Sequence, residues 1–121
     1  MQYMALIYAD ETGWDSLADG EKEAVYGRYR SLADEARAAG VMVGGNELRP
    51  TRDATAVRVR GSEPIVTDGP YAEVKEALGG FFLFQCESIE AALDWAARIP
   101  AAEHGAVEVR PVYVDPAEVQ P

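Results

Sequence analysis

The side chains of this sequence that could do chemistry are concentrated in segment 67–80. Within it, an aspartate, a phenol, two glutamates and a lysine share nine consecutive positions: Asp68, Tyr71, Glu73, Lys75 and Glu76. A carboxylate close to a lysine and a partly buried surface can have its pKa shifted in either direction, which suits proton transfer or the binding of a polar ligand. We therefore take Asp68 as the candidate catalytic or anchoring group, with Tyr71, Glu73 and Lys75 as candidate ligand-binding groups.

A purely structural interpretation of the same residues is open. Aspartate, glycine and proline are common in turns, and glycine before proline accommodates backbone that other residues resist. Asp68-Gly69-Pro70 could then serve only to shape a turn. In that case the protein would be a non-catalytic binding or regulatory module, and spacing alone does not choose between the two interpretations.

His104 and Arg110 are the candidate site residues outside this segment. His104 is the only histidine, and its ordinary pKa near 6.5 would suit a general base, although surface-loop histidines are more common. Arg110 shares one side of a predicted strand with Glu108, opposite two valines. Its planar guanidinium suits a carboxylate ligand. An ion pair of Glu108 and Arg110 at a dimer seam is the alternative.

The sequence gives little reason to expect a metal or a cofactor. One histidine and one cysteine are too few for a recognisable zinc site. A hard cation on Asp68, Glu73 and Glu76 stays open, although no EF-hand pattern is present. The glycine pairs 44–45 and 79–80 belong to neither a GxGxxG nor a Walker pattern.

Composition limits the partners and the location. The 121 residues fit one domain, for which we expect the bounds 1–121, and their net charge of −10 disfavours nucleic acid and anionic membranes. The N-terminus lacks a basic region and a cleavage site, and no apolar run approaches the ~20 residues of a membrane span. We therefore expect a cytoplasmic protein. Cys86 has no second cysteine to pair with, so we expect it to be a buried small hydrophobe.

Hydrophobic periodicity and turn residues predict the elements that position these side chains. We expect strands over 2–9, 41–48, 54–60, 65–67, 79–86 and 106–112, a helix that begins between Ser16 and Glu21 and stops at Gly40, a second helix from Ser88 to Pro100, and a C-terminal arm over 114–121. The order βαβ, hairpin, βαβ is typical of an α+β, ferredoxin-like fold, with two helices on one face of an antiparallel sheet.

Several details of these elements can be tested. We expect Ser16-Leu17-Ala18-Asp19 to form a capping box and Ser88 to cap the second helix. In strand 54–60 we expect one side to be packed and the other to be basic. The two glycines of strand 41–48 predict a bulge or a close approach of backbone. The expected apolar positions are Val25, Tyr29, Leu32 and Ala36 in the first helix, and Ala92, Leu93, Trp95, Ala96 and Ile99 in the second.

Two of the predicted strands predict a homodimer. Strands 2–9 and 80–86 are apolar on both sides, whereas two helices can cover only one face of the sheet. A second copy of the same sheet is the simplest cover for the other face.

The motif also resembles a known family. The run Asp68-Gly69-Pro70-Tyr71-Ala72-Glu73-Val74-Lys75-Glu76, followed by Leu78-Gly79-Gly80-Phe81, is similar to the signature of the DGPF subgroup of YCII-related proteins, with Tyr71 where that name has phenylalanine. Segments 91–96, 99–102 and 105–111 resemble the subgroup in the same order, so the resemblance covers nearly the whole chain.

This resemblance implies a dimeric α+β barrel with a cleft at the sheet face of each subunit. In YCII-like proteins a His and Asp pair in that cleft has been taken as a possible active site, and Asp68 is the member of that pair best represented here. His104 does not match the other member. The subgroup has no firmly assigned reaction, and some members are encoded beside extracytoplasmic-function sigma factors, which implies a regulatory or stress context.

Overall fold

An antiparallel sheet of four strands forms the centre of the computed structural model, which describes residues 1–118. The strands lie in the order β2-β5-β1-β6, and every neighbouring pair is antiparallel. Their bounds are β1 (Gln2–Ala9), β2 (Met42–Glu47), β5 (Ala77–Gln85) and β6 (Ala106–Pro111). The two strands that are apolar on both sides, β1 and β5, are the central ones, as strands of this pattern should be.

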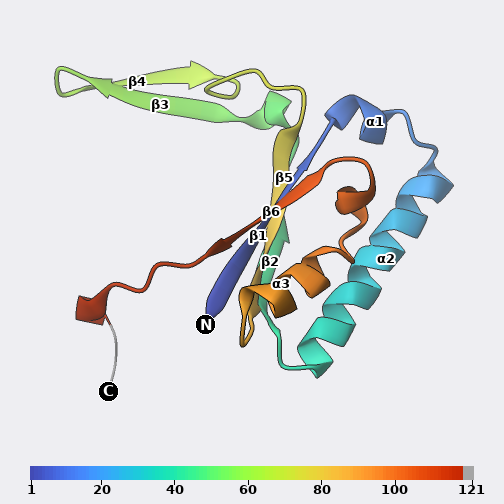
Figure 1. Cartoon of the computed structure of the whole chain (residues 1–121). Helices are drawn as coiled ribbons and strands as arrows, with labels where there is room; N and C mark the ends of the chain where they lie inside the picture. The colour runs from blue at the N-terminus through green and yellow to red at the C-terminus, as the bar shows by residue number, and fades with distance from the viewer. Residues whose placement is uncertain (119–121) are drawn as a thin grey trace.

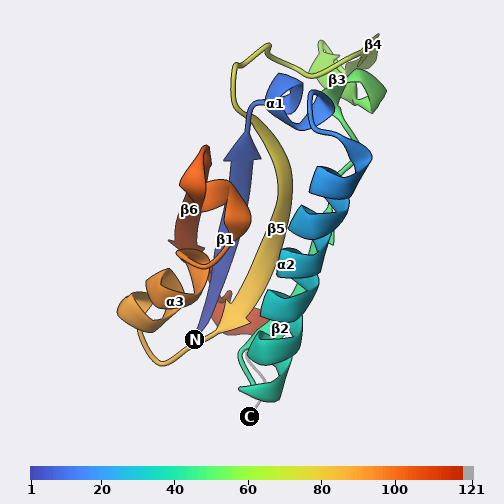
Figure 2. The same cartoon turned by 90° about the vertical axis from the view of Figure 1, so that its right-hand side faces the viewer.

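Two helices, α2 (Asp19–Ala38) and α3 (Ile89–Ala96), cover one face of this sheet (Figures 1 and 2). The core lies between the helices and the sheet, and its buried members include Tyr3, Ala5, Leu32, Ala36, Phe84, Ala92, Ala96 and Ile99. The predicted α+β, ferredoxin-like architecture is confirmed. Leu93 was wrongly assigned to the apolar side of α3, because its side chain is 48% exposed.

Helix α2 begins at Asp19, within the predicted range of Ser16 to Glu21, but its cap differs from the prediction. Its first turn is closed by Glu21, whose Oε1 accepts a hydrogen bond from the backbone nitrogen of Ala18 at 3.0 Å. Ser16 does not cap this helix, because it ends a short preceding helix, α1 (Glu11–Asp15), where its hydroxyl donates to the carbonyl of Gly13 at 2.8 Å. The cap at Ser88 is confirmed, since its Oγ accepts from the backbone nitrogen of Ala91 at 3.2 Å.

The glycines of β2 have the two roles expected of them. The pairing of β2 with β5 shifts register between Met42 and Gly44, which is a bulge. At Gly45 a Cβ atom would lie 2.6 Å from the ring of Phe82 and 2.8 Å from the carbonyl of Phe81. Only glycine lets the two strands approach this closely.

Strands β3 (Thr55–Arg60) and β4 (Glu63–Asp68) form a separate hairpin, which we call the arm. The arm projects from one end of the sheet (Figure 1). Gly61 and Ser62 make its turn with positive φ angles of 54° and 68°. The expected packed side of β3 is wrong: Val57 and Val59 are 63% and 60% exposed, because the arm does not lie on the body of the chain.

The face of the sheet opposite the helices, which we call the open face, is covered by no element within the described residues. Its centre is apolar and partly exposed, with Met4 and Leu6 from β1 beside Phe81 and Leu83 from β5. The arm and the segment after β6 both extend on the side of this face (Figure 1). That segment contains a 3₁₀ turn over Pro116–Glu118. The remaining residues of the predicted C-terminal extension, 119–121, lie outside the described residues.

Candidate functional site

Asp68 is the last residue of β4 and is exposed. It pairs with Thr55 of β3, and the next pair on the same side of the arm is Val57 with Val66. Within the described residues, the Asp68 carboxylate takes part in no hydrogen bond or ion pair. It is therefore free to bind a ligand or a partner.

The turn after Asp68 depends on the next residue. Gly69 has a φ of 96°, which side-chain-bearing residues rarely adopt, and its backbone nitrogen donates to the carbonyl of Ala54 at 2.7 Å. The carboxylate of Asp68 contributes no bond to this turn. The geometry thus separates a structural role, carried by Gly69, from whatever role Asp68 has.

A groove of about 510 Å³, open to solvent, lies at the base of the arm and is lined by two neighbours of Asp68, Thr55 and Gly69, but not by Asp68 itself. Its lining is mainly apolar and consists of Ala54, Thr55, Ala56, Val57, Arg58, Gly69, Pro70 and Tyr71. Tyr71 is 80% exposed at this groove. Tyr71 is the one candidate ligand-binding residue among those that line this groove.

Lys75 influences a different carboxylate from the one expected. Hydrogen bonds from the hydroxyl and the backbone nitrogen of Thr12 lower the pKa of Asp10, and the positive charge of Lys75 adds a smaller effect in the same direction. Lys75 therefore lies near the end of β1. Glu73 is exposed in the same loop, between β4 and β5.

His104 and Arg110 lie on other elements. His104 is exposed and ends the 3₁₀ helix η2 (Pro100–Glu103). Arg110 is exposed on β6 opposite Met4, and Glu108 lies opposite Leu6, so both charges border the open face as expected. No hydrogen bond or ion pair within residues 1–118 joins any two of the six candidate residues, Asp68, Tyr71, Glu73, Lys75, His104 and Arg110. Within this range the six residues are therefore not linked to one another by polar contacts.

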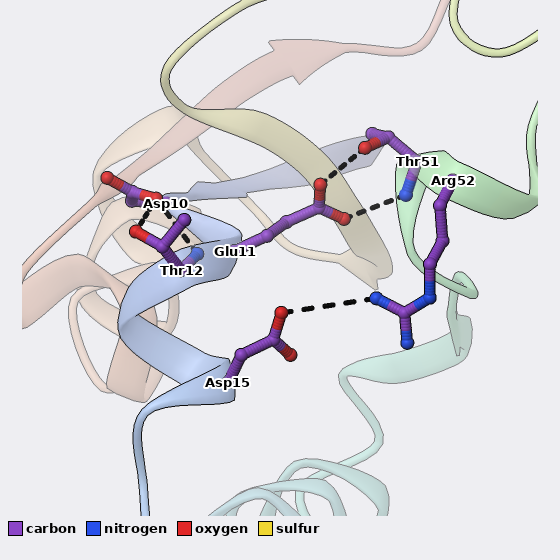
Figure 3. A network of polar contacts seen from close by, with 6 residues as sticks. All are labelled: Asp10, Glu11, Thr12, Asp15, Thr51 and Arg52. Atoms are coloured by element: carbon purple, nitrogen blue, oxygen red, sulfur yellow. Dashed lines mark hydrogen bonds and ion pairs between the residues drawn. The ribbon is translucent and has the colours of Figure 1, made fainter.

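A polar network that sequence reasoning missed holds the base of the arm to helix α1 (Figure 3). The carboxylate of Glu11 in α1 accepts hydrogen bonds from both the backbone nitrogen, at 2.8 Å, and the hydroxyl of Thr51. Asp15 and Arg52 form a looser ion pair of 3.9 Å beside it. Thr51 and Arg52 belong to the short 3₁₀ helix η1 (Thr51–Asp53), which leads into β3. One signal in the sequence could have indicated α1. Asp10 lies two residues before Thr12, and an aspartate at this spacing commonly caps the start of a helix.

The described part of the chain has neither a cluster of metal ligands nor a membrane-spanning helix. Among residues 1–118, no group of three or more His, Cys, Asp or Glu side chains is arranged to hold a metal ion, and this includes the carboxylates near Asp68. No helix in the same range is long and apolar enough to cross a membrane.

Comparison with known proteins places the chain in a family. Residues 1–114 match the model of the YCII-related domain. An uncharacterized protein of Rhizobium meliloti (strain 1021) is 37% identical over 114 residues, which cover 93% of this chain and 92% of that protein. The family model matches nearly the full length of the chain, and the fold described above agrees with it. The chain therefore belongs to the YCII-related domain family.

Proposed function

We propose that the protein is a homodimer that binds a small anionic molecule in a cleft at the open face of the sheet. The observation that carries this proposal is the open face itself. Its centre is apolar, and Arg110 and Glu108 stand at its border on β6. A second sheet would cover the apolar centre, and ligand pockets commonly combine such apolar walls with a few convergent polar groups.

In this proposal Arg110 holds the anionic group of the ligand. Its guanidinium forms no ion pair within the described residues, so its donors are available for a bidentate carboxylate contact. Asp68 is the polar anchor or proton-transfer group, because its carboxylate is exposed and, within residues 1–118, has no hydrogen-bond or ion-pair partner. The same site can bind a ligand without turnover, and the Asp68 carboxylate is the group that would make the site a catalyst.

The alternative is a non-catalytic binding or regulatory module in which Asp68-Gly69-Pro70 is a structural turn. We also propose the narrower assignment of the chain to the DGPF subgroup. Some members of that subgroup are encoded beside sigma factors, and this supports the regulatory alternative. Gly69 accounts for the turn without help from the Asp68 side chain. This favours a role for Asp68 beyond the turn. A cytoplasmic location remains part of the proposal.

A panel of small carboxylic acids, used as probes in thermal-shift titrations, tests the ligand class. We expect at least one acid to raise the midpoint of wild type in a saturable way, since a ligand that binds only the folded state stabilises it. Arg110→Gln should abolish that rise. The matched control is Arg37→Gln, because Arg37 is exposed in the last turn of α2 and pairs only with Asp34 at 3.3 Å among the described residues. A panel without any saturable shift, or equal loss in both variants, would contradict the proposal.

A further inference from the structure

We infer that the arm packs against the partner subunit and places Asp68 of one chain in the cleft of the other. This inference rests on the proposed function, because it requires a dimer built on the open face. It deepens that function by making each site a product of both chains.

The first observation is that the arm is unsupported in one chain. It is a two-stranded sheet separate from the main one, and both of its strands are exposed along nearly their whole length. Two-stranded hairpins are marginally stable in water unless they pack against something. The Glu11 and Thr51 contacts hold only the base of the arm, so its strands require another surface.

The second observation is that the two sides of the arm differ. Residues directly opposite each other in antiparallel strands share a side. One side, which we call the valine side, carries the pairs Val57 with Val66, Val59 with Pro64, and Thr55 with Asp68. The other side carries Arg58 with Ile65, Arg60 with Glu63, and Ala56 with Thr67. The valine side is a continuous apolar surface that ends at the Asp68 carboxylate.

The third observation identifies a second copy of this chain as the occupant. The arm and the segment after β6 extend from opposite ends of the sheet on its open side, so they bound the space in front of the open face (Figure 1). A partner sheet in that space would lie between them. Arg58 and Arg60 balance Glu63 and Asp68, so segment 54–68 is neutral, whereas the whole chain carries −10. A neutral apolar arm can therefore contact an acidic partner without the like-charge repulsion that two acidic surfaces would meet.

The proposed dimer would bring together candidate residues that no polar contact joins within the described part of one chain. Asp68 lies on the arm and Arg110 on the border of the open face, and no contact joins them within the described chain. Asp68 lies at the base of the arm, where the valine side begins, so a partner sheet that packs against the valine side would bring the open face bordered by Arg110 of the partner subunit next to Asp68. The dimer would then contain two equivalent sites, each with an aspartate from one chain and an arginine from the other.

Intermolecular paramagnetic broadening tests this placement directly. One sample of chains carries a nitroxide on Asp68→Cys, a second is unmodified and ¹⁵N-labelled, and the two are mixed so that mixed dimers form. Cys86 is buried and should not react with the label. We expect strong broadening of the ¹⁵N-labelled amides of Met4, Leu6 and Arg110. The matched control places the nitroxide on Asp34→Cys, on the exposed side of α2 behind the sheet, and should leave those amides sharp.

Dissociation constants of the dimer test the valine side. In a symmetric dimer, each of the variants Val57→Asp and Val66→Asp changes the interface at two equivalent positions. With a loss of about tenfold at each position, we expect either variant to raise the dissociation constant about 100-fold. The matched control is Ile65→Asp, which is next to Val66 but on the other side of the arm and should stay within about threefold of wild type. All three positions are exposed in the single chain, and circular dichroism should show the same fold in each variant.

The outcomes separate this inference from the function on which it rests. If Leu6→Asp in the open face splits the dimer while Val57→Asp and Val66→Asp leave it intact, the dimer stands and the arm inference is overturned. The arm inference also fails if Ile65→Asp is as damaging as Val66→Asp, or if the nitroxide at position 68 broadens no amide of the partner. A wild-type monomer would overturn both the dimer and the arm inference.

Discussion

The contact between Glu11 and Thr51 gives the sharpest prediction on stability, since it ties α1 to the base of the arm. The perturbation is Glu11→Ala, which removes a carboxylate that accepts two hydrogen bonds from one residue in a partly buried setting. Hydrogen bonds to charged groups contribute about 1.5–3 kcal/mol each when buried, and partial exposure reduces that value. We expect Glu11→Ala to lower the free energy of unfolding by about 2 kcal/mol, which for a chain of this length lowers Tm by about 8 °C.

The neighbouring contact in the same network is the control. The Asp15 and Arg52 side chains are 3.9 Å apart and are 54% and 70% exposed, and ion pairs of this kind contribute between about 0 and 1 kcal/mol. Asp15→Ala should therefore cost less than about 0.5 kcal/mol. The assay is urea unfolding followed by circular dichroism at one fixed protein concentration, because dimer stability depends on concentration. Equal losses in the two variants would refute the reasoning.

Three further predictions concern a strand contact, the candidate site and pH. Gly105→Ala would place a Cβ atom 2.1 Å from the carbonyl oxygen of Tyr8, so it should cost about 2 kcal/mol or more in urea unfolding, whereas Gly13→Ala, with nothing within 4 Å, should not destabilise. Asp68→Asn should leave Tm within about 1 °C of wild type, because the turn does not use its carboxylate; a large fall in Tm would restore the structural interpretation. A hydrogen bond from Arg28 lowers the pKa of Glu103 below its ordinary 4.5, so the stability from this group is complete above pH 4.5 and is lost as the pH falls through the lower folded-state value. Arg28→Gln should flatten that part of the pH profile, and an unchanged profile would contradict the assignment.

Regular elements could be predicted from sequence because their periodicity records which side faces the core. The spacing of Leu32 and Ala36 identified the buried side of α2, and the alternation of Val107 and Val109 with their charged neighbours identified the two sides of β6. The tight approach at Gly45 was anticipated for a similar reason, since glycine inside a strand marks a place without room for a side chain.

The same signal failed where no element among the described residues packs against the strand. Val57 and Val59 alternate as a packed strand would, yet in one chain they face solvent. Alternation shows that a side is apolar, but it does not identify what covers that side. The short helix α1 was missed because it has only five residues with a glycine among them, and its start depends on a side-chain cap by Asp10.

The arrangement of the candidate site residues could not be predicted from sequence. Asp68, Glu73 and Lys75 are close in sequence, but the chain turns sharply at Gly69 and Lys75 lies near Asp10. In a loop, closeness in sequence does not predict in which direction each side chain points. Arg110 was correctly placed on the side of β6 away from the helices because a strand has a fixed period of two.

The molar mass in solution tests the central claim, that two chains meet across the open face, most directly. Light scattering on the purified protein at micromolar concentration should give about 26 kDa, twice the 13.1 kDa of one chain. Leu6→Asp, which puts a charge at the centre of the open face, should shift the mass toward that of one chain. A wild-type mass near 13.1 kDa would contradict the account, because the apolar centre of the open face would then stay exposed.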